Sequence, residues 1–226
     1  MQTHRKIVVS LLLVAASTIA ASAFAQSIGG GLRLGTPGIG LELESLVTDR
    51  FGIRALANGG SISHDYDESG IQYDGKFRFG TGFLLADWHP YATGFRLSGG
   101  LAYNNQRFEG SARPGGGTVN INGTNYSAAQ VGSLDGRVRF SKASPYVGVG
   151  WGLSPRAGSR LYFSADLGVM YQRPNATLTG TCGTALPAGV CAQLQSDIRA
   201  EEGEFREAAD DLRFYPVISV GFGLRF

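Results

Sequence analysis

Apolar and polar residues alternate with a period of two through much of the chain, most clearly at its end. In YPVISVGFGLRF (215–226), apolar side chains hold every even position up to Phe226, and most odd positions hold Ser, Gly or Arg. This period places the two sets on opposite faces of a β-strand. The stretch therefore predicts a strand with one apolar face and one face of small or charged residues.

Six earlier segments show the same alternation. The segments span residues 39–47, 51–57, 73–85, 95–103, 146–153 and 161–171, and their bulky positions include Ile39, Leu41, Phe51, Ile53, Tyr73, Phe77, Phe79, Phe83, Leu85, Leu97, Tyr103, Val149, Trp151, Phe163 and Leu167. Strands of soluble proteins usually have about five or six residues, whereas a tilted strand that crosses a bilayer needs ~9–11 with an apolar lipid-facing side. Because several segments run past ten residues, we expect the bulky set to face lipid and the small or charged set to line a narrow interior.

The connections between these strands alternate in length. Short ones lie at 48–50, 89–94 and 154–159, and longer ones at 61–70, 113–133 and 174–211. Bacterial outer-membrane barrels show this alternation, with short turns in the periplasm and long loops outside. The sequence therefore predicts an all-β fold, an eight-stranded antiparallel transmembrane β-barrel with short periplasmic turns and longer outer loops.

The strand count depends on residues 28–47, which form either one strand or two joined at Gly35-Thr36-Pro37-Gly38. Pro flanked by Gly is typical of a turn, and an even count returns the N-terminus to the periplasm. We therefore favour two strands. Alternation also changes phase within 141–145, which indicates either a β-bulge or a strand that begins only at Pro145.

Two of the long connections show local order of their own. Residues 113–130 are rich in Gly and predict a small hairpin. Residues 200–212 are acidic and helix-prone, and with Leu194, Ile198 and Phe205 as apolar anchors they suggest an amphipathic helix that caps the barrel.

The N-terminus predicts a secretory signal peptide. Arg5 and Lys6 precede the apolar run 7–16, and Ala23-Phe24-Ala25 fits the cleavage site. The apolar run is shorter than the ~20 residues of a spanning helix. We therefore expect a cleaved signal at 1–25 and a single outer-membrane barrel domain at 26–226.

Removal of this signal changes the charge balance. The whole chain has 20 Lys and Arg against 18 Asp and Glu, and loss of Arg5 and Lys6 leaves 18 against 18. No basic cluster suggests a nucleic-acid partner. The two cysteines, Cys182 and Cys191, predict a disulfide because the exported chain meets an oxidising compartment.

Ionisable residues recur at positions expected to face the interior of the barrel. The predicted lumenal charges are Arg33, Glu42, Glu44, Arg54, Asp74, Lys76, Arg78, Arg96, Asp166, Arg213 and Arg225. Charges in a narrow lumen either pair into a plug or line a water-filled path that sets selectivity. Both interpretations stay open at this point.

The sequence gives little support to catalysis. His64 has Ser61, Ser63 and Asp65 near it in sequence, but a catalytic triad needs residues that converge in space. His89 lies in a predicted turn, and the spacing of Asp65, Asp67 and Glu68 does not fit a calcium loop. We therefore expect no enzyme, no cofactor and no metal.

The signal peptide, the alternating strands and the ending VISVGFGLRF resemble small eight-stranded outer-membrane barrels of the protein W and protein A-type families. The resemblance implies residence in the outer membrane as a monomer, in contact with outer-membrane lipid and lipopolysaccharide. It also implies that Phe222, Leu224 and Phe226 are the signal read by the barrel-assembly machinery. The implied function is structural or a narrow passive channel for small solutes, including apolar ones. A surface-binding module acting through the outer loops is the alternative, and a lipid A-modifying enzyme is least favoured.

Overall fold

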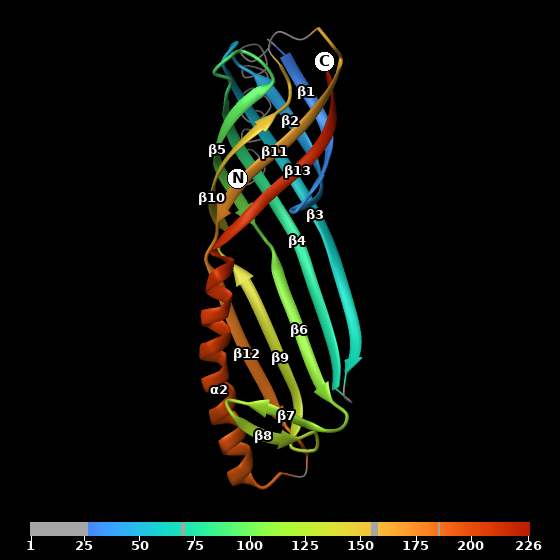
Figure 1. Cartoon of the computed structure of the whole chain (residues 1–226), viewed down its shortest axis with the longest axis vertical. Coiled ribbons are helices and arrows are strands. Elements are labelled where there is room, and N and C mark those ends of the chain that lie inside the picture. Colours follow the sequence, from blue (N-terminus) through green and yellow to red (C-terminus); the bar gives the residue numbers. More distant parts are fainter. Residues whose placement is uncertain (1–26, 69–70, 155–157, 185) are drawn as a thin grey trace, which may run out of the picture.

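The structure is a computed structural model that describes residues 27–68, 71–154, 158–184 and 186–226. The predicted signal peptide lies outside these residues. Almost all the regular structure is antiparallel β-sheet, and Figure 1 shows two regions stacked along the long axis of the molecule.

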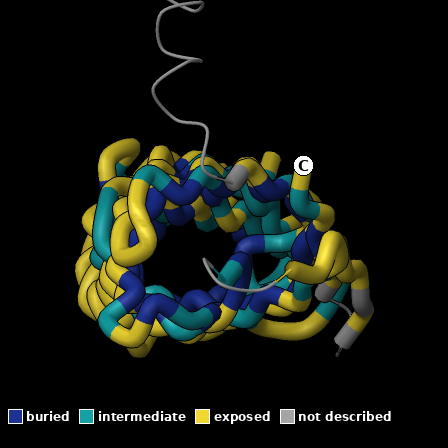
Figure 2. Tube along the Cα trace, turned by 90° about the horizontal axis from the view of Figure 1, so that it is seen from above, coloured by how far each residue is buried: buried dark blue, intermediate teal, exposed yellow. Residues whose placement is uncertain are grey.

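The first region is a ring of eight strands. The strands are β1 (Ser27–Gly35), β2 (Gly38–Leu46), β3 (Phe51–Glu68), β4 (Ile71–Trp88), β5 (Phe95–Asn104), β10 (Ala143–Trp151), β11 (Leu161–Tyr171) and β13 (Phe214–Arg225). They follow the order β4-β3-β2-β1-β13-β11-β10-β5, and β5 pairs back onto β4 to close the ring. Figure 2 shows this closed outline with exposed positions on its outside.

The second region, here called the extension, is continuous with two strands of the ring, β3 and β4. β3 and β4 have 18 residues each, whereas the other ring strands have between 9 and 12. Only residues 81–88 of β4 pair with β5; residues 71–78 pair with β6 (Arg107–Pro114). The sheet then continues through β9 (Val131–Phe140) to β12 (Pro174–Cys182).

A helix and a hairpin complete the extension. The hairpin consists of β7 (Thr118–Ile121) and β8 (Thr124–Ser127), and α2 (Ala188–Asp210) leads through the 3₁₀ turn η1 (Asp211–Arg213) into β13. Leu194 and Ile198 of α2 are buried with Ile121 and Tyr126 of the hairpin. The hairpin and the helical segment are confirmed, but α2 lies along the extension and does not cap the ring (Figure 1). No helix within the described residues is long and apolar enough to span a membrane.

The Cys182–Cys191 disulfide is present, with a Cα–Cα distance of 5.8 Å. It joins the end of β12 to the first turn of α2. The prediction of long loops at 113–133 and 174–211 is wrong in this respect, because those segments hold strands, a hairpin and a helix with cores of their own. The long connection predicted at 61–70 is also wrong, because β3 continues to Glu68 and β4 begins at Ile71.

The turn expected at Gly35–Gly38 separates β1 from β2. Gly38 has φ +102°, a conformation that a side chain disfavours, and a Cβ there would lie 2.6 Å from the carbonyl oxygen of Gly59. The phase change at 141–145 is no bulge. It is the gap at 141–142 between β9, which belongs to the extension, and β10, which belongs to the ring.

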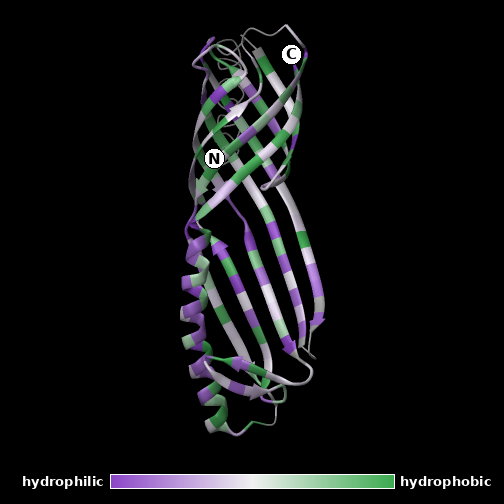
Figure 3. Cartoon of the chain, viewed as in Figure 1, coloured by the Kyte–Doolittle hydropathy of each residue, from purple (hydrophilic) through white to green (hydrophobic). Residues whose placement is uncertain are grey.

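Alternation fixes which side chains face out of the ring. Leu97 and Val149 are exposed on its outside, and Phe222 is 63% exposed. Figure 3 shows hydrophobic bands recurring around the ring, whereas the strands of the extension carry more hydrophilic positions. The predicted faces of β2, β5, β10, β11 and β13 agree with this arrangement.

The predicted face of β4 is reversed. Phe83 is 5% exposed and lies with Leu85 inside the ring, while Leu84 is 64% exposed on the outside. The sequence FLLADW has apolar residues at both phases, and a shift of one residue exchanges the two faces of a strand. Phe77 therefore lies on the face that continues the ring interior, and Asp74, Lys76 and Arg78 lie on the opposite face.

Candidate functional site: the charged interior of the ring

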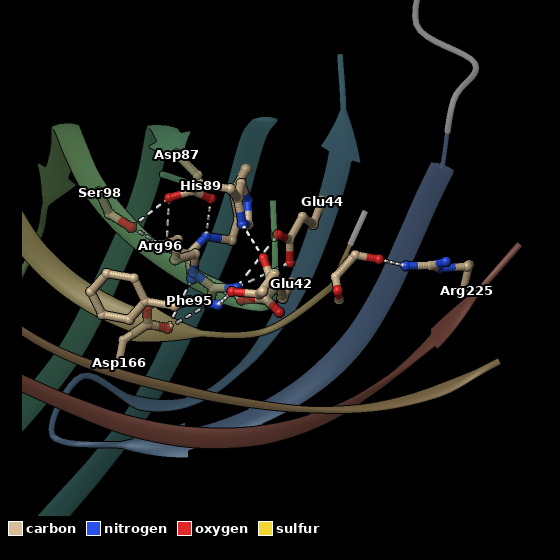
Figure 4. Close-up of polar contacts among 12 residues, drawn as sticks. Glu42, Glu44, Asp87, His89, Phe95, Arg96, Ser98, Asp166 and Arg225 are labelled. Carbon is tan, nitrogen blue, oxygen red and sulfur yellow. Dashed lines mark hydrogen bonds and ion pairs between the residues drawn. The ribbon is translucent and has the colours of Figure 1, made fainter. Parts of the chain in front are cut away.

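Seven ionisable side chains meet inside the ring, and here they are called the ion-pair cluster. All are buried, and they come from six strands: Arg33, Glu42, Glu44, Arg54, Asp87, Arg96 and Asp166. Each occupies an inward position of its strand, and Glu44 lies directly opposite Arg54 in the β2–β3 register. Figure 4 shows several of them converging.

Asp166 of β11 is the centre of the cluster. Its Oδ2 accepts hydrogen bonds from Arg54 Nη1 at 2.8 Å and from Arg96 Nη2 at 3.1 Å. Arg33 also donates to the same oxygen. One carboxylate therefore binds three guanidinium groups from three strands, which ties together opposite parts of the ring wall.

Arg54 has the most complete set of partners. Its Nε and Nη2 donate to the two carboxylate oxygens of Asp87 at 2.9 and 3.1 Å, the bidentate geometry in which arginine pairs are strongest. Nη2 also donates to Ser98 Oγ at 3.0 Å, and Nη1 lies 3.2 Å from Glu42 Oε2. Arg54 has no exposed surface. These partners are needed because a buried charge without partners is costly.

The remaining pairs close the network. Arg33 binds Glu42, and Arg96 Nη1 lies 3.4 Å from Glu44 Oε1. The cluster contains three guanidinium groups and four carboxyl groups. Opposite charges are therefore interleaved with one carboxyl group in excess.

An apolar layer lies beside the cluster, towards the extension. Its buried members are Phe83, Leu85, Ala102, Tyr146, Met170 and Val217. The rings of Phe83 and Tyr146 pack edge to face with centroids 5.5 Å apart. A cavity of about 10 Å³ is lined by residues of both layers, including Arg54, Phe83 and Tyr146. This volume is at the lower limit for a single water, so little space remains between the two layers at this level.

The sequence placed six of the cluster residues inside the ring and missed Asp87, which follows from the reversed face of β4. The other predicted lumenal charges lie elsewhere. Lys76 is exposed on the extension, and Asp74 there pairs with Arg113 at 2.8 Å. Arg213 is exposed and pairs with Asp210. Arg225 has the inward phase of β13 as predicted, but it lies at the end of the ring and donates to the carbonyl oxygen of Ser154.

The two histidines do not form a catalytic set with their sequence neighbours. His64 lies on the opposite face of β3 from Ser63 and Asp65, because successive residues of a strand alternate. His89 is buried, and its Nδ1 lies 2.8 Å from the carbonyl oxygen of Thr93. Within the described part of the chain, no group of three or more His, Cys, Asp or Glu side chains is placed to hold a metal.

No protein-family model and no curated protein matches the chain. Its fold is similar to those of Acinetobacter baumannii CarO2 (TM-score 0.60, 22% identity) and CarO (TM-score 0.56, 20% identity). Both comparisons cover 88% of this chain and 98% of the other. A major outer membrane protein from Thermus thermophilus matches over the same shares at 16% identity, but with a TM-score of only 0.38.

These neighbours are outer-membrane β-barrel proteins. At such identities the likeness concerns the fold alone. The narrower resemblance to the protein W and protein A-type families is not supported by these comparisons.

Proposed function

We propose that the chain is an outer-membrane β-barrel whose ring spans the bilayer with a closed lumen and holds the extension outside the cell. The observation that carries this proposal is the filled interior. The ion-pair cluster and the apolar layer together occupy the ring, and the cavity between them has room for no more than about one water. Such a ring suits an anchor better than a permanently open conduit.

The outer face of the ring supports its place in a membrane. The outward positions of β1, β2 and β13 carry Leu, Ile, Val and Phe, with Ile39 67% exposed. Burying such side chains in lipid is favourable, whereas a monomeric soluble protein rarely exposes so large an apolar surface. The strand lengths of 9 to 12 residues also suit a tilted passage through a bilayer.

The orientation follows from the two ends of the ring. Residues 48–50 and 89–94 and the C-terminal Phe226 lie at the end away from the extension, and short turns face the periplasm in barrels of this kind. Phe222, Leu224 and Phe226 are exposed on β13, which pairs with β1 and β11. They remain our candidates for the assembly signal, and the predicted signal peptide would deliver the chain to the periplasm.

The extension is then the part available for binding outside the cell. It is an ordered sheet braced by α2 and a disulfide. On the face that continues the ring interior, Ile62 and Phe108 stay exposed beyond the reach of α2. This observation favours a surface-binding role, with the ring as its anchor.

Conductance in planar bilayers tests the closed lumen. The purified full-length protein should give no steady single-channel conductance. The variant Phe83→Ser/Tyr146→Ser, which removes two rings from the apolar layer, should leak, and the outward control Tyr103→Phe should stay silent. Steady conductance of the wild type would refute a closed anchor and favour a conduit.

Placement of the extension is tested separately. An epitope inserted between Asn122 and Gly123, in the exposed turn of the hairpin, should be accessible to antibody on intact cells. A matched insertion at Asp49, in a short turn, should become accessible only after the outer membrane is permeabilised. The reverse pattern would overturn the orientation.

A further inference from the structure

Three arginines stand side by side on the extension. Arg78 of β4 lies directly opposite Arg107 of β6, and Arg107 lies directly opposite Arg139 of β9. Side chains at opposed positions of an antiparallel sheet share a face. With strands about 4.8 Å apart, the three side chains start within about 10 Å of one another. This set is called the arginine row.

The arginine row has no counter-ion among the residues that the structure describes. Among the described residues, the three arginines form no ion pair, and the Nε of Arg107 is buried without a hydrogen-bond partner. Like charges directly opposite one another destabilise a sheet. A bound anion would supply the negative charge that the row lacks and would reduce this repulsion.

The positions flanking the row also suit an anion. Ser61 lies opposite Arg78 at one end, and Asn175 lies opposite Arg139 at the other. Both are exposed and carry hydrogen-bond donors. The register thus aligns five donor side chains across five strands. In the next row on the same face, the Glu109 carboxylate lies 3.5 Å from Arg137 Nε.

The row lies at a defined distance from the apolar surface of the ring. On β4, Arg78 faces the same side as Gly82 and the exposed Leu84, which face out of the ring. Leu84 pairs with Leu101, and Gly82 pairs with the exposed Tyr103. Lys142 Nζ lies 5.5 Å from the centre of the Tyr103 ring. On the outside of the ring, the side chains met on moving towards the extension are therefore leucine, then tyrosine, then cationic residues.

This order matches the layers of a bilayer, where hydrocarbon gives way to an aromatic girdle and then to charged headgroups. Arg78 lies four positions before Gly82, which is about 13 Å along a strand. At a tilt of about 40° that corresponds to roughly 10 Å along the membrane normal. The row therefore stands at the depth where lipid phosphates lie.

We propose that the arginine row binds the phosphate groups of a phosphorylated glycolipid in the outer leaflet. The inference rests on the proposed place of the ring in the outer membrane. Guanidinium groups form paired hydrogen bonds to phosphate oxygens, and three adjacent groups suit a headgroup with more than one phosphate. The ligand relieves the repulsion within the row and fixes the extension against the membrane surface.

The test uses the purified full-length protein and three probes: bisphosphorylated lipopolysaccharide, the same lipid after enzymatic dephosphorylation, and inorganic phosphate. The variant is Arg78→Gln/Arg107→Gln/Arg139→Gln. Its control, Lys76→Gln/Arg113→Gln/Arg137→Gln, removes the same charge from the same face in rows farther from the ring. Binding is measured by titration in detergent, and heat-modifiable migration on gels checks folding.

The wild type should bind the phosphorylated lipid at least tenfold more tightly than the dephosphorylated lipid. The row variant should lose at least tenfold in affinity for the phosphorylated lipid, and the control less than threefold. If the row variant does not fold, Arg107→Gln alone should lose at least threefold, and Arg107→Lys should lose less.

Equal losses in the row and control variants would overturn the proposal, because the effect would then come from net charge alone. Equal binding of the dephosphorylated lipid would also overturn it, as would displacement of the lipid by millimolar inorganic phosphate. These titrations need no intact membrane. A failure of the antibody assay on cells would therefore count against the proposed location and leave the binding result independent.

Discussion

The molecule has two sets of three arginines that lie in opposite environments. Arg33, Arg54 and Arg96 lie inside the ring, where four carboxyl groups surround them. Arg78, Arg107 and Arg139 lie on the outside of the extension without a carboxylate partner among the described residues. A charge buried inside a protein must be paired there, whereas a charge at the surface is stabilised by water or by a ligand. In the proposed function the first set helps to fill the ring, and in the further proposal the second set binds a ligand outside the protein.

Breaking the interior set should have the largest effect. Arg54→Leu leaves Asp87, Glu42 and Asp166 short of a partner, and removing one member of a buried network costs about 3–5 kcal/mol. We expect a large fall in the thermal transition of the folded protein, followed by heat-modifiable migration. Arg113→Leu, which breaks an exposed pair, should cost no more than about 1 kcal/mol. Equal effects of the two substitutions would refute the role of the cluster.

The disulfide distinguishes the stability of the two regions. The variant Cys182→Ser/Cys191→Ser opens a short loop and should cost about 2–3 kcal/mol. Because both cysteines belong to the extension, hydrogen exchange should rise in α2 and β12 and stay unchanged in β1, β2 and β13. Faster exchange throughout the ring would show that the two regions unfold as one.

Removing a charge from the arginine row should have a smaller effect of the opposite sign. Arg107→Gln relieves repulsion from Arg78 and Arg139, and a cross-strand pair contributes roughly 0.2–1 kcal/mol. In detergent free of lipopolysaccharide, thermal unfolding should show a variant at least as stable as the wild type. Destabilisation under these conditions would mean that Arg107 has a structural role within the sheet.

The smallest expected effect is a dependence on pH of the contact between the hairpin and α2. Asp197 accepts a hydrogen bond from Tyr126 Oη, which holds the pKa of its carboxyl group below the usual value against the effect of desolvation. Burial and the same hydrogen bond raise the pKa of Tyr126 to about 12. A carboxyl group with a lowered pKa stabilises the fold above its unfolded pKa of about 3.9, and this contribution is lost as the pH falls through the folded pKa.

Protection of residues 118–127 against hydrogen exchange, after correction for the intrinsic exchange rate at each pH, should therefore fall below about pH 4 in the wild type. Asp197→Asn should show little such dependence, since it removes the titrating group. An equal dependence on pH in both proteins would assign the effect to another group.

The sequence predicted the ring better than the extension, and the reason is physical. In β10 and β13 one phase is bulky throughout and the other is mostly small or polar, apart from Tyr146, Tyr215 and Val217, so alternation assigns the faces. In β4, Phe83 and Leu84 place apolar groups on both phases. Only the packing of Phe83 on Tyr146, from a strand distant in sequence, decides between them. Because of this ambiguity, the sequence did not identify Asp87 as an inward residue that could pair with Arg54.

The strands of the extension could not be predicted from the sequence for a related reason. These strands carry polar residues, Thr included, on one face, and on the other a mixture of Gly, Ala and a few large apolar residues. Such segments look like loops until neighbouring strands and a helix supply a core. The hairpin and α2 were recognisable because their own residues, such as Leu194 and Ile198, mark a buried side.

Fluorescence of the two tryptophans can show whether the ring spans a bilayer. Trp88 and Trp151 are 45% and 52% exposed at the ends of β4 and β10, on the outside of the ring. They are the only tryptophans in the chain. In vesicles of brominated phospholipid, we expect strong quenching, greatest for bromines near the headgroup end of the acyl chain, with little quenching by aqueous iodide. Strong quenching by iodide without quenching by brominated lipid would contradict a ring that spans the membrane.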